Sequence, residues 1–311
     1  MDFPYVGESF ALLAPLCWSF AVILFRVTGE SVPPVALNLY KNVVATLLFG
    51  ATLLGLVLFT GEGGAPQGVE PWHYGLLLLS GLIGVGIADL FFFMCLNRVG
   101  AGRQAIVNTA YSPPIILLSW WLLGERMSAL QFLGVAAILA AVLFVGMTRQ
   151  RPGEAEPRVL VAGILYGLAG SISQAVSIVM VKPFMDEWPL VWTTFWRILG
   201  GLVAALLMAW WARPERRGLE SLRGPRTWRV MLPATVLGSY VSLLMWMAGF
   251  KFADASVAAA LNQTSTLFTF VLAAVLLREP VTARRLLGLL CGLLGVVLVT
   301  FFGEAASGTV G

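Results

Sequence analysis

Long apolar stretches recur along the whole 311-residue chain, and they restrict its fold more than any other feature. A helix that crosses a lipid bilayer needs about 20 predominantly apolar residues. Hydrophobic residues make up 59% of the chain and charged residues 12%, whereas a water-soluble domain has about half and about a quarter. We therefore predict an all-α, polytopic membrane protein. Ten transmembrane helices are expected, at Ser9–Phe25, Val35–Thr60, Trp72–Leu96, Ala105–Gly124, Phe132–Met147, Leu160–Val181, Val191–Trp211, Val230–Phe250, Ala258–Leu277 and Leu286–Phe302.

One segment near the middle of the chain is repeated near its end. LLGERMSALQFLGV (Leu122–Val135) returns as LLREPVTARRLLGL (Leu276–Leu289), 154 residues later and with six of fourteen positions identical. The polar stretch RQRPGEAEPR (Arg149–Arg158) separates two halves that each contain five predicted spans. We predict two five-helix repeats at residues 1–148 and 159–303, with a linker at 149–158 and a tail at 304–311.

Five crossings per half is an odd number, so the second half must enter the membrane from the opposite face. Two such repeats are inverted and related by a pseudo-two-fold axis in the membrane plane, as in secondary transporters with a substrate site at the repeat interface. Fifteen Lys and Arg residues lie in the loops after odd-numbered spans, and three lie in the loops of the other side. The positive-inside rule then places the first set in the cytoplasm and both chain ends outside.

The stretch YSPPIILLSWWLLGERMSALQFLGVAAILAAVLFVG (Tyr111–Gly146) resembles the EamA-type domain of the drug/metabolite transporter superfamily. In that family an LGE closes the fourth helix and a glycine-rich fifth helix follows. Here LGE is Leu123–Glu125, and its counterpart is LRE at Leu277–Glu279. The resemblance implies a ten-span permease, commonly an exporter of amino acids, metabolites or drugs. Many relatives are described with both termini in the cytoplasm, whereas the charge distribution here places them outside.

Three charged residues lie inside predicted spans: Lys41, Asp89 and Arg197. A charge inside a bilayer costs about 2.5–3.5 kcal/mol on insertion scales, so it needs a role or a partner. Lys41 and Arg197 are candidates for binding a substrate carboxylate, and Asp89 for binding an amino group or a coupling proton. Two other interpretations stay open: Lys41 and Asp89 neutralise each other, or the long basic stems reach an interface.

Neutral polar side chains form stripes at helical spacing in three spans. They are Asn108, Tyr111 and Ser112 in the fourth span, Ser171, Gln174 and Ser177 in the sixth, and Asn262, Thr266 and Thr269 in the ninth, with Gln263 next to the last stripe. Such stripes suit either a polar ligand in a cavity or hydrogen bonds between packed helices. Because Asn108 and Asn262 correspond in the two repeats, we expect the fourth and ninth spans to line a shared pathway.

Pro113 and Pro114 remove two backbone donors from the fourth span. They predict a kink that either gates the pathway or simply fits the bundle. Glu125 and Glu279 end the fourth and ninth spans, where we expect each to bond backbone amides or arginines and hold the turn. Tryptophans inside the spans are candidates for an apolar wall against the substrate, with packing or an interfacial belt as the alternative. These tryptophans are Trp18, Trp192, Trp196 and Trp246.

We expect a secondary membrane transporter of small organic metabolites such as amino acids, acting as an exporter by alternating access around a central site. The alternative is a proton-coupled drug or cation efflux permease that uses Asp89. An enzyme is not expected, because the chain has one histidine, His73, and no HExxH, GxSxG or P-loop pattern. No cofactor or metal is expected, since the three cysteines lie singly in separate spans. The expected partners are a small-molecule substrate and membrane lipid but no nucleic acid, with a monomer or homodimer in the cell (inner) membrane.

Overall fold

The computed structural model describes residues 6–61, 64–111, 113–114, 117–118, 128–146, 156–185, 188–212, 218–252, 261–262 and 264–301. Every regular element within these ranges is helical, as the sequence predicts. In this described part of the chain, six helices are long and apolar enough to cross a membrane: Ser9–Thr28, Pro34–Thr60, Pro71–Val99, Pro157–Val181, Leu190–Trp211 and Thr227–Trp246. Two shorter apolar helices cover Ala129–Phe144 and Thr264–Leu276. Ten spans stay a prediction, because parts of the fourth and ninth predicted spans lie outside the described residues.

The first half of the chain contains one long helical rod and several separate helices. Its elements are α1 (Val6–Thr28), α2 (Pro34–Thr60), α3 (Pro71–Gly81), η1 (Leu82–Ile87), α4 (Ala88–Val99), α5 (Ala101–Asn108), η2 (Thr109–Tyr111) and α7 (Ala129–Gly146). The rod is formed by α3, η1 and α4, which follow one another without a break, η1 being a short π-helix. We call Pro71–Val99 the central rod.

The second half repeats this layout. Its elements are α8 (Pro157–Met185), α9 (Leu190–Trp211), η3 (Leu219–Arg223), α11 (Pro225–Thr235), η4 (Val236–Val241), α12 (Ser242–Phe252), α14 (Thr264–Leu276) and α15 (Ala283–Phe301). Helices α2, α3, α8 and α11 all begin at a proline. Proline suits that place because its fixed φ is helical and its missing N–H would have no intrahelical acceptor.

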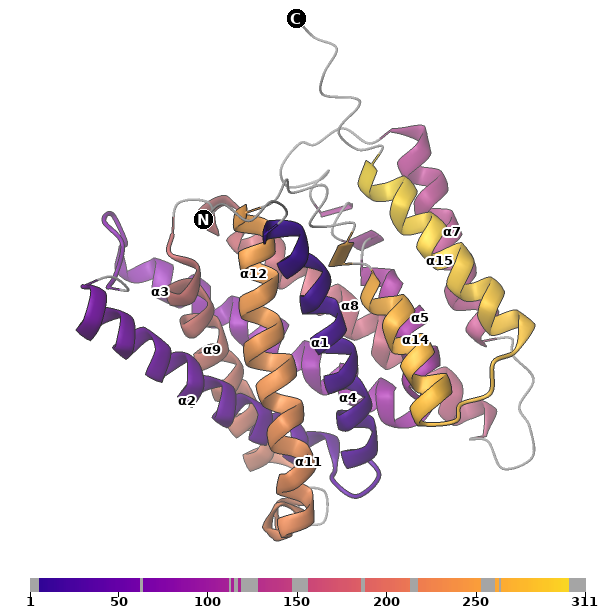
Figure 1. Cartoon of the computed structure of the whole chain (residues 1–311), viewed down its shortest axis with the longest axis horizontal. Coiled ribbons are helices and arrows are strands. Elements are labelled where there is room, and N and C mark those ends of the chain that lie inside the picture. Colours follow the sequence, from indigo (N-terminus) through magenta and orange to yellow (C-terminus); the bar gives the residue numbers. More distant parts are fainter. Residues whose placement is uncertain are drawn as a thin grey trace, which may run out of the picture.

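Helices of the two halves pack on each other and do not form two separate bundles (Figure 1). From the first half, α1 packs against α11, η4, α12 and α14 of the second. In the same way α8 of the second half packs against the central rod and α5 of the first. Helix α2 packs against α9, and α7 packs against α15 at one edge of the molecule (Figure 1). One buried cluster shows the mixing, since it joins Phe25, Leu37 and Phe93 to Met231 and Ala273.

The two π-helices lie at matching positions in the halves, because η1 starts at Leu82 and η4 starts 154 residues later at Val236. A π-turn inserts an extra residue into a helix and is often found at functional sites. Each π-helix also contains a glycine that touches a helix of the other half. A Cβ on Gly84 would overlap Ser177 of α8, and a Cβ on Gly238 would lie 2.7 Å from that of Ala21 on α1. Gly84 and Gly238, at equivalent positions in the two halves, therefore make equivalent close contacts with the opposite half.

Candidate functional site

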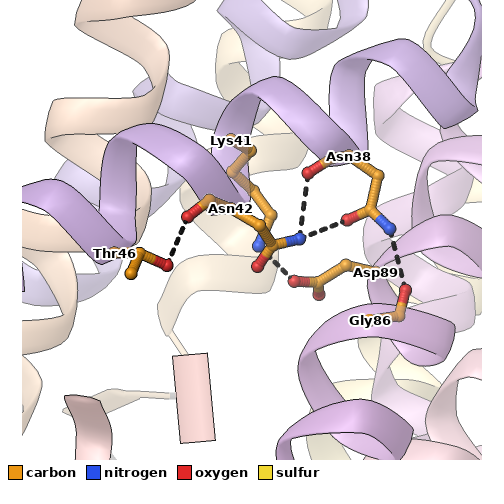
Figure 2. Close-up of polar contacts among 6 residues, drawn as sticks. All are labelled: Asn38, Lys41, Asn42, Thr46, Gly86 and Asp89. Carbon is orange, nitrogen blue, oxygen red and sulfur yellow. Dashed lines mark hydrogen bonds and ion pairs between the residues drawn. The ribbon is translucent and has the colours of Figure 1, made fainter. Parts of the chain in front are cut away.

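The ammonium of Lys41 on α2 forms an ion pair with the carboxylate of Asp89 on α4 (Figure 2). Only 6% of the Lys41 side chain is exposed, against 25% of the Asp89 side chain. Both residues lie in helices of membrane-spanning length, where each charge alone would be costly. Of the interpretations left open by the sequence, mutual neutralisation of Lys41 and Asp89 is confirmed. Because part of the Asp89 side chain is exposed, the ion pair is not completely enclosed by the surrounding helices.

A ladder of neutral polar groups surrounds this ion pair on the same side of α2 (Figure 2). The Asn38 amide donates to the carbonyl of Gly86 in the π-helix η1, at 2.8 Å. Asn42 donates to the backbone and side-chain oxygens of Asn38, both at 2.9 Å. Thr46 donates to the backbone carbonyl of Asn42 at 2.7 Å. Because Asn38, Asn42 and Thr46 are spaced by four residues, they share one face of α2, and this face meets the central rod.

The guanidinium of Arg197 on α9 meets the central rod at a second point. Its Nε donates to the hydroxyl of Ser80 at 3.1 Å, and Nη2 donates to the hydroxyl of Ser177 at 3.0 Å. Ser80 lies in α3 and Ser177 in α8, so three helices meet here. Gln174, one turn before Ser177, brings Oε1 to 3.5 Å from the place where a Cβ would stand on Gly84. Arg197 and Gln174, both predicted site residues, thus lie in one polar cluster.

The two polar clusters are electrostatically linked. Asp89 lies close enough to Arg197 for its charge to act on the guanidinium, and the neutral Tyr111 hydroxyl lies in the same neighbourhood. Tyr111 ends the short 3₁₀-helix η2, which follows α5 and precedes Pro113 and Pro114. The change from α to 3₁₀ geometry fits the proline pair, because Pro113 and Pro114 lack the N–H groups that would bond to the carbonyls of Thr109 and Ala110. Lys41, Asp89, Tyr111, Gln174 and Arg197 are therefore gathered around one region, whereas a gate at Pro113–Pro114 stays a prediction.

The predicted stripe of the ninth span has two different environments. Thr266 and Thr269 are buried, and the Thr269 hydroxyl donates to that of Ser19 on α1 at 3.0 Å. Thr269 therefore joins packed helices. Asn262 is half-buried, and Asn108 at the end of α5 is exposed. Gln263 lies outside the described residues, so the shared pathway expected from the Asn108 and Asn262 pair stays a prediction.

Aromatic side chains pack beside the Arg197 cluster. Trp196 contacts Tyr74, with ring centroids 4.8 Å apart, and Trp192, at 6.4 Å. Its indole N–H is buried and has no hydrogen-bond partner in the described part of the chain. Trp18 is half-buried on α1, and its ring lies 5.7 Å from that of Phe92. Packing accounts for most of these contacts, but the unpaired N–H of Trp196 leaves one donor available for a ligand.

Glu279 lies in the turn between α14 and α15 and bonds backbone amides and an arginine, as the sequence predicts. Its carboxylate accepts the backbone N–H groups of Ala101 at 2.7 Å and Gly102 at 3.1 Å, and lies 4.0 Å from the Arg285 guanidinium. Ala101 and Gly102 begin α5, so Glu279 satisfies two of the N–H groups that a helix start leaves free. Glu125, its counterpart, lies outside the described residues. No group of three His, Cys, Asp or Glu side chains suited to a metal ion exists among the residues described.

Comparison with known proteins explains this repeated layout. The model of the EamA-like transporter family matches the chain twice, over residues 5–147 and 161–301. The chain belongs to the EamA-like transporter family. Each of the two matches covers one half of the chain. The resemblance read from Tyr111–Gly146 is confirmed, and the chain is a membrane protein with several apolar spans.

Two relatives of this EamA-family chain match it over most of their own lengths. A protein of Archaeoglobus fulgidus described as an uncharacterized transporter is 22% identical over 289 residues, covering 93% of this chain and 96% of its own. Protein PecM of Dickeya dadantii is 25% identical over 285 residues, covering 90% and 88%. One crystal structure covers 96% of this chain and 98% of its own, with a TM-score of 0.62 and 17% identity. At that identity the likeness shows a shared fold.

Sequence reasoning missed several residues of the site. Ser80, Asn38 and Asn42 were not predicted, although all three are buried and hydrogen-bonded. A signal existed for the asparagines, because Asn38, Lys41 and Asn42 are spaced by three and four residues and share a helix face. Ser80 carried no such signal. It lies in an apolar helix with leucine at all four preceding positions, and only its contact with α8 and α9 gives it a role.

Proposed function

We propose that this protein is a secondary transporter that exports small organic metabolites, amino acids among them, by alternating access. In this proposal ten spans form two inverted five-helix repeats, and the substrate binds where they meet. The observation that carries it is the gathering of Lys41, Asp89 and Arg197 along the central rod, between helices of both halves. Charges are rare inside spans, and those that occur usually mark a substrate or ion pathway.

The packing between halves supports alternating access. Helices α2 and α9 correspond in the two repeats, pack on each other, and carry Lys41 and Arg197 at equivalent places, eight residues after Pro33 and Pro189. In inverted repeats, equivalent residues lie at equal depths from opposite faces of the membrane. Rocking one repeat against the other would then open the site first from one side and then from the other.

Counterflow in proteoliposomes tests the proposal. Vesicles loaded with an unlabelled amino acid should accumulate the same radiolabelled compound above equilibrium, because a carrier returns faster when it is loaded. Protein-free vesicles measure leakage, and vesicles with the Arg197→Gln variant test the site. If a panel of amino acids, other carboxylates, sugars and cationic dyes gives no counterflow, the protein is not a metabolite carrier of this kind.

A second candidate is a proton-coupled efflux permease for drugs or cations. The observation in its favour is the accessible edge of Asp89, whose side chain is 25% exposed inside a membrane-length helix. If Asp89 carried the coupling proton, Asp89→Asn would abolish dye efflux driven by a pH gradient, while substrate counterflow without a gradient would continue. Efflux that is unchanged in Asp89→Asn would eliminate this candidate.

The location and state of the protein complete the proposal. We place it in the cell (inner) membrane as a multi-pass monomer or homodimer, with membrane lipid around it and no nucleic acid, cofactor or metal. A carrier without a catalytic pattern is not expected to be an enzyme. The excess of Lys and Arg in the loops after odd-numbered spans places both termini outside. Labelling in intact cells tests that orientation.

A further inference from the structure

Arg197 is a half-buried cation whose hydrogen-bond partners are neutral. Its two hydrogen bonds go to the hydroxyls of Ser80 and Ser177, and no carboxylate of the described residues lies within ion-pair distance. It is the eighth residue of α9, which places it about 10 Å from the helix start at 1.5 Å per residue. Asp89 acts on this guanidinium only from a distance and is in contact with Lys41, so Arg197 has no ion-pair partner of its own among the described residues.

The two serines hold the guanidinium in a fixed orientation. Ser80 donates to the carbonyl of Ser177 at 2.9 Å, and Ser177 donates to the carbonyl of Ser80 at 2.7 Å. Each hydroxyl has one proton, so both protons are used and the lone pairs point to Arg197. This arrangement consumes two of the five N–H groups of the guanidinium and leaves three. Three free N–H groups suffice for a bidentate contact with a carboxylate.

The equivalent basic residue in the first repeat is not available in this way. Lys41 is buried and bound to Asp89, and the charges of that pair cancel. Ser80 and Asp89 are nine residues apart on the central rod, which separates the two contact points by about 13 Å along the helix. One side of the site is therefore neutral and the other carries a single positive charge.

We propose that Arg197 binds the carboxylate of the transported solute, with Ser80 and Ser177 as positioning residues. The proposal rests on the transport function above and names its substrate class: small molecules with one carboxylate, in preference to amides, esters and cations. The guanidinium fork suits carboxylate and phosphate alike, but its single charge balances a carboxylate and would leave a dianionic phosphate with one uncompensated charge inside the membrane.

Binding to the purified full-length protein in detergent tests this assignment. The probes are acid and amide pairs of equal shape: phenylalanine with phenylalaninamide, and 4-methylpentanoate with 4-methylpentanamide. Affinity is measured from the rise in unfolding temperature with ligand concentration. Charge-assisted hydrogen bonds predict that at least one acid binds about tenfold to a hundredfold more tightly than its amide. Arg197→Gln should reduce this ratio to within about twofold, and Arg197→Lys should keep part of it.

Two further variants separate positioning from folding. Arg229→Gln changes an exposed arginine on α11 and should leave the acid-to-amide ratio unchanged. Ser80→Ala with Ser177→Ala should lower the affinity for the acid about fivefold or more while the affinity for the amide stays the same. A merely structural effect of the serines would weaken both ligands together, and that result would remove their positioning role.

Several outcomes would overturn the proposal. One is an acid-to-amide ratio near one in the unaltered protein, or no binding of any acid. Another is a ratio that survives Arg197→Gln but is lost in Lys41→Gln, which would move the anion site to the other cluster. Counterflow of amides or cations without a preference for acids would refute the carboxylate site and leave the transport function standing. Absence of all counterflow would refute both.

Discussion

Removing one member of the Lys41–Asp89 pair should destabilise the protein more than removing both. Breaking a buried ion pair costs about 3–5 kcal/mol, because the remaining charge is left uncompensated. Asp89→Asn leaves the ammonium of Lys41 unpaired. Because the Lys41 side chain is only 6% exposed, this substitution should lower the free energy of unfolding by about 3–4 kcal/mol. Asp89 is 25% exposed, so Lys41→Met, which leaves a partly solvated carboxylate, should cost about 2–3 kcal/mol.

The double variant distinguishes this reasoning from simple loss of packing. With both charges gone no ion stays buried alone, so Lys41→Met with Asp89→Asn should cost less than Asp89→Asn by itself. Equilibrium unfolding in mixed detergent and SDS micelles measures the free energies, and Arg229→Gln, at an exposed position, serves as the control within about 0.5 kcal/mol. If the two single costs add to the double within about 0.5 kcal/mol, the charges are not coupled and the reasoning is wrong.

Three other substitutions test separate contacts. Glu279→Gln should lower the free energy of unfolding by about 1–2 kcal/mol, because the charge that accepts two N–H groups of α5 is lost; an unchanged value would deny Glu279 this role. Gly81→Ala should prevent accumulation of folded protein on gel filtration, because its Cβ would overlap the backbone of Arg197, whereas Gly75→Ala on the same helix meets nothing within 4 Å and should be tolerated. Thr269→Val should cost about 0.6 kcal/mol and leave the acid-to-amide ratio unchanged, since its bond to Ser19 joins two helices; a changed ratio would bring Thr269 into the site.

The helical fold follows from the sequence because apolar runs of span length have few alternatives in lipid. In the bilayer core every backbone group must find its partner within the same helix, so Pro34–Thr60 and Leu190–Trp211 were predictable within a few residues. The π-helices η1 and η4 were not. Their extra residue leaves no mark in the apolar pattern of the sequence, although the repeat spacing of 154 relates them once one is known.

The sequence allowed the charged residues of the site to be predicted, but it did not allow their contacts to be predicted. Lys41, Asp89 and Arg197 stand out because charges are rare inside spans. Which charges pair depends on packing between helices far apart in the chain, and no local pattern encodes it. The contact of Arg197 with Ser80, 117 residues away, is of this kind. The lining expected from Asn108 and Asn262 stays a prediction, with Asn108 exposed at the end of α5 and Asn262 half-buried.

The inverted arrangement of the repeats is the claim on which alternating access depends, and sidedness labelling tests it most directly. Cysteine is placed at position 2, as Asp2→Cys, or in the linker, as Gly153→Cys, in a chain whose three native cysteines are replaced by serine or alanine. An impermeant maleimide is then applied to intact and to permeabilised cells. We predict that the two positions lie on opposite sides, so that Asp2→Cys is labelled in intact cells and Gly153→Cys only after permeabilisation. Labelling of both from the same side would mean an even number of crossings per half and would contradict the account.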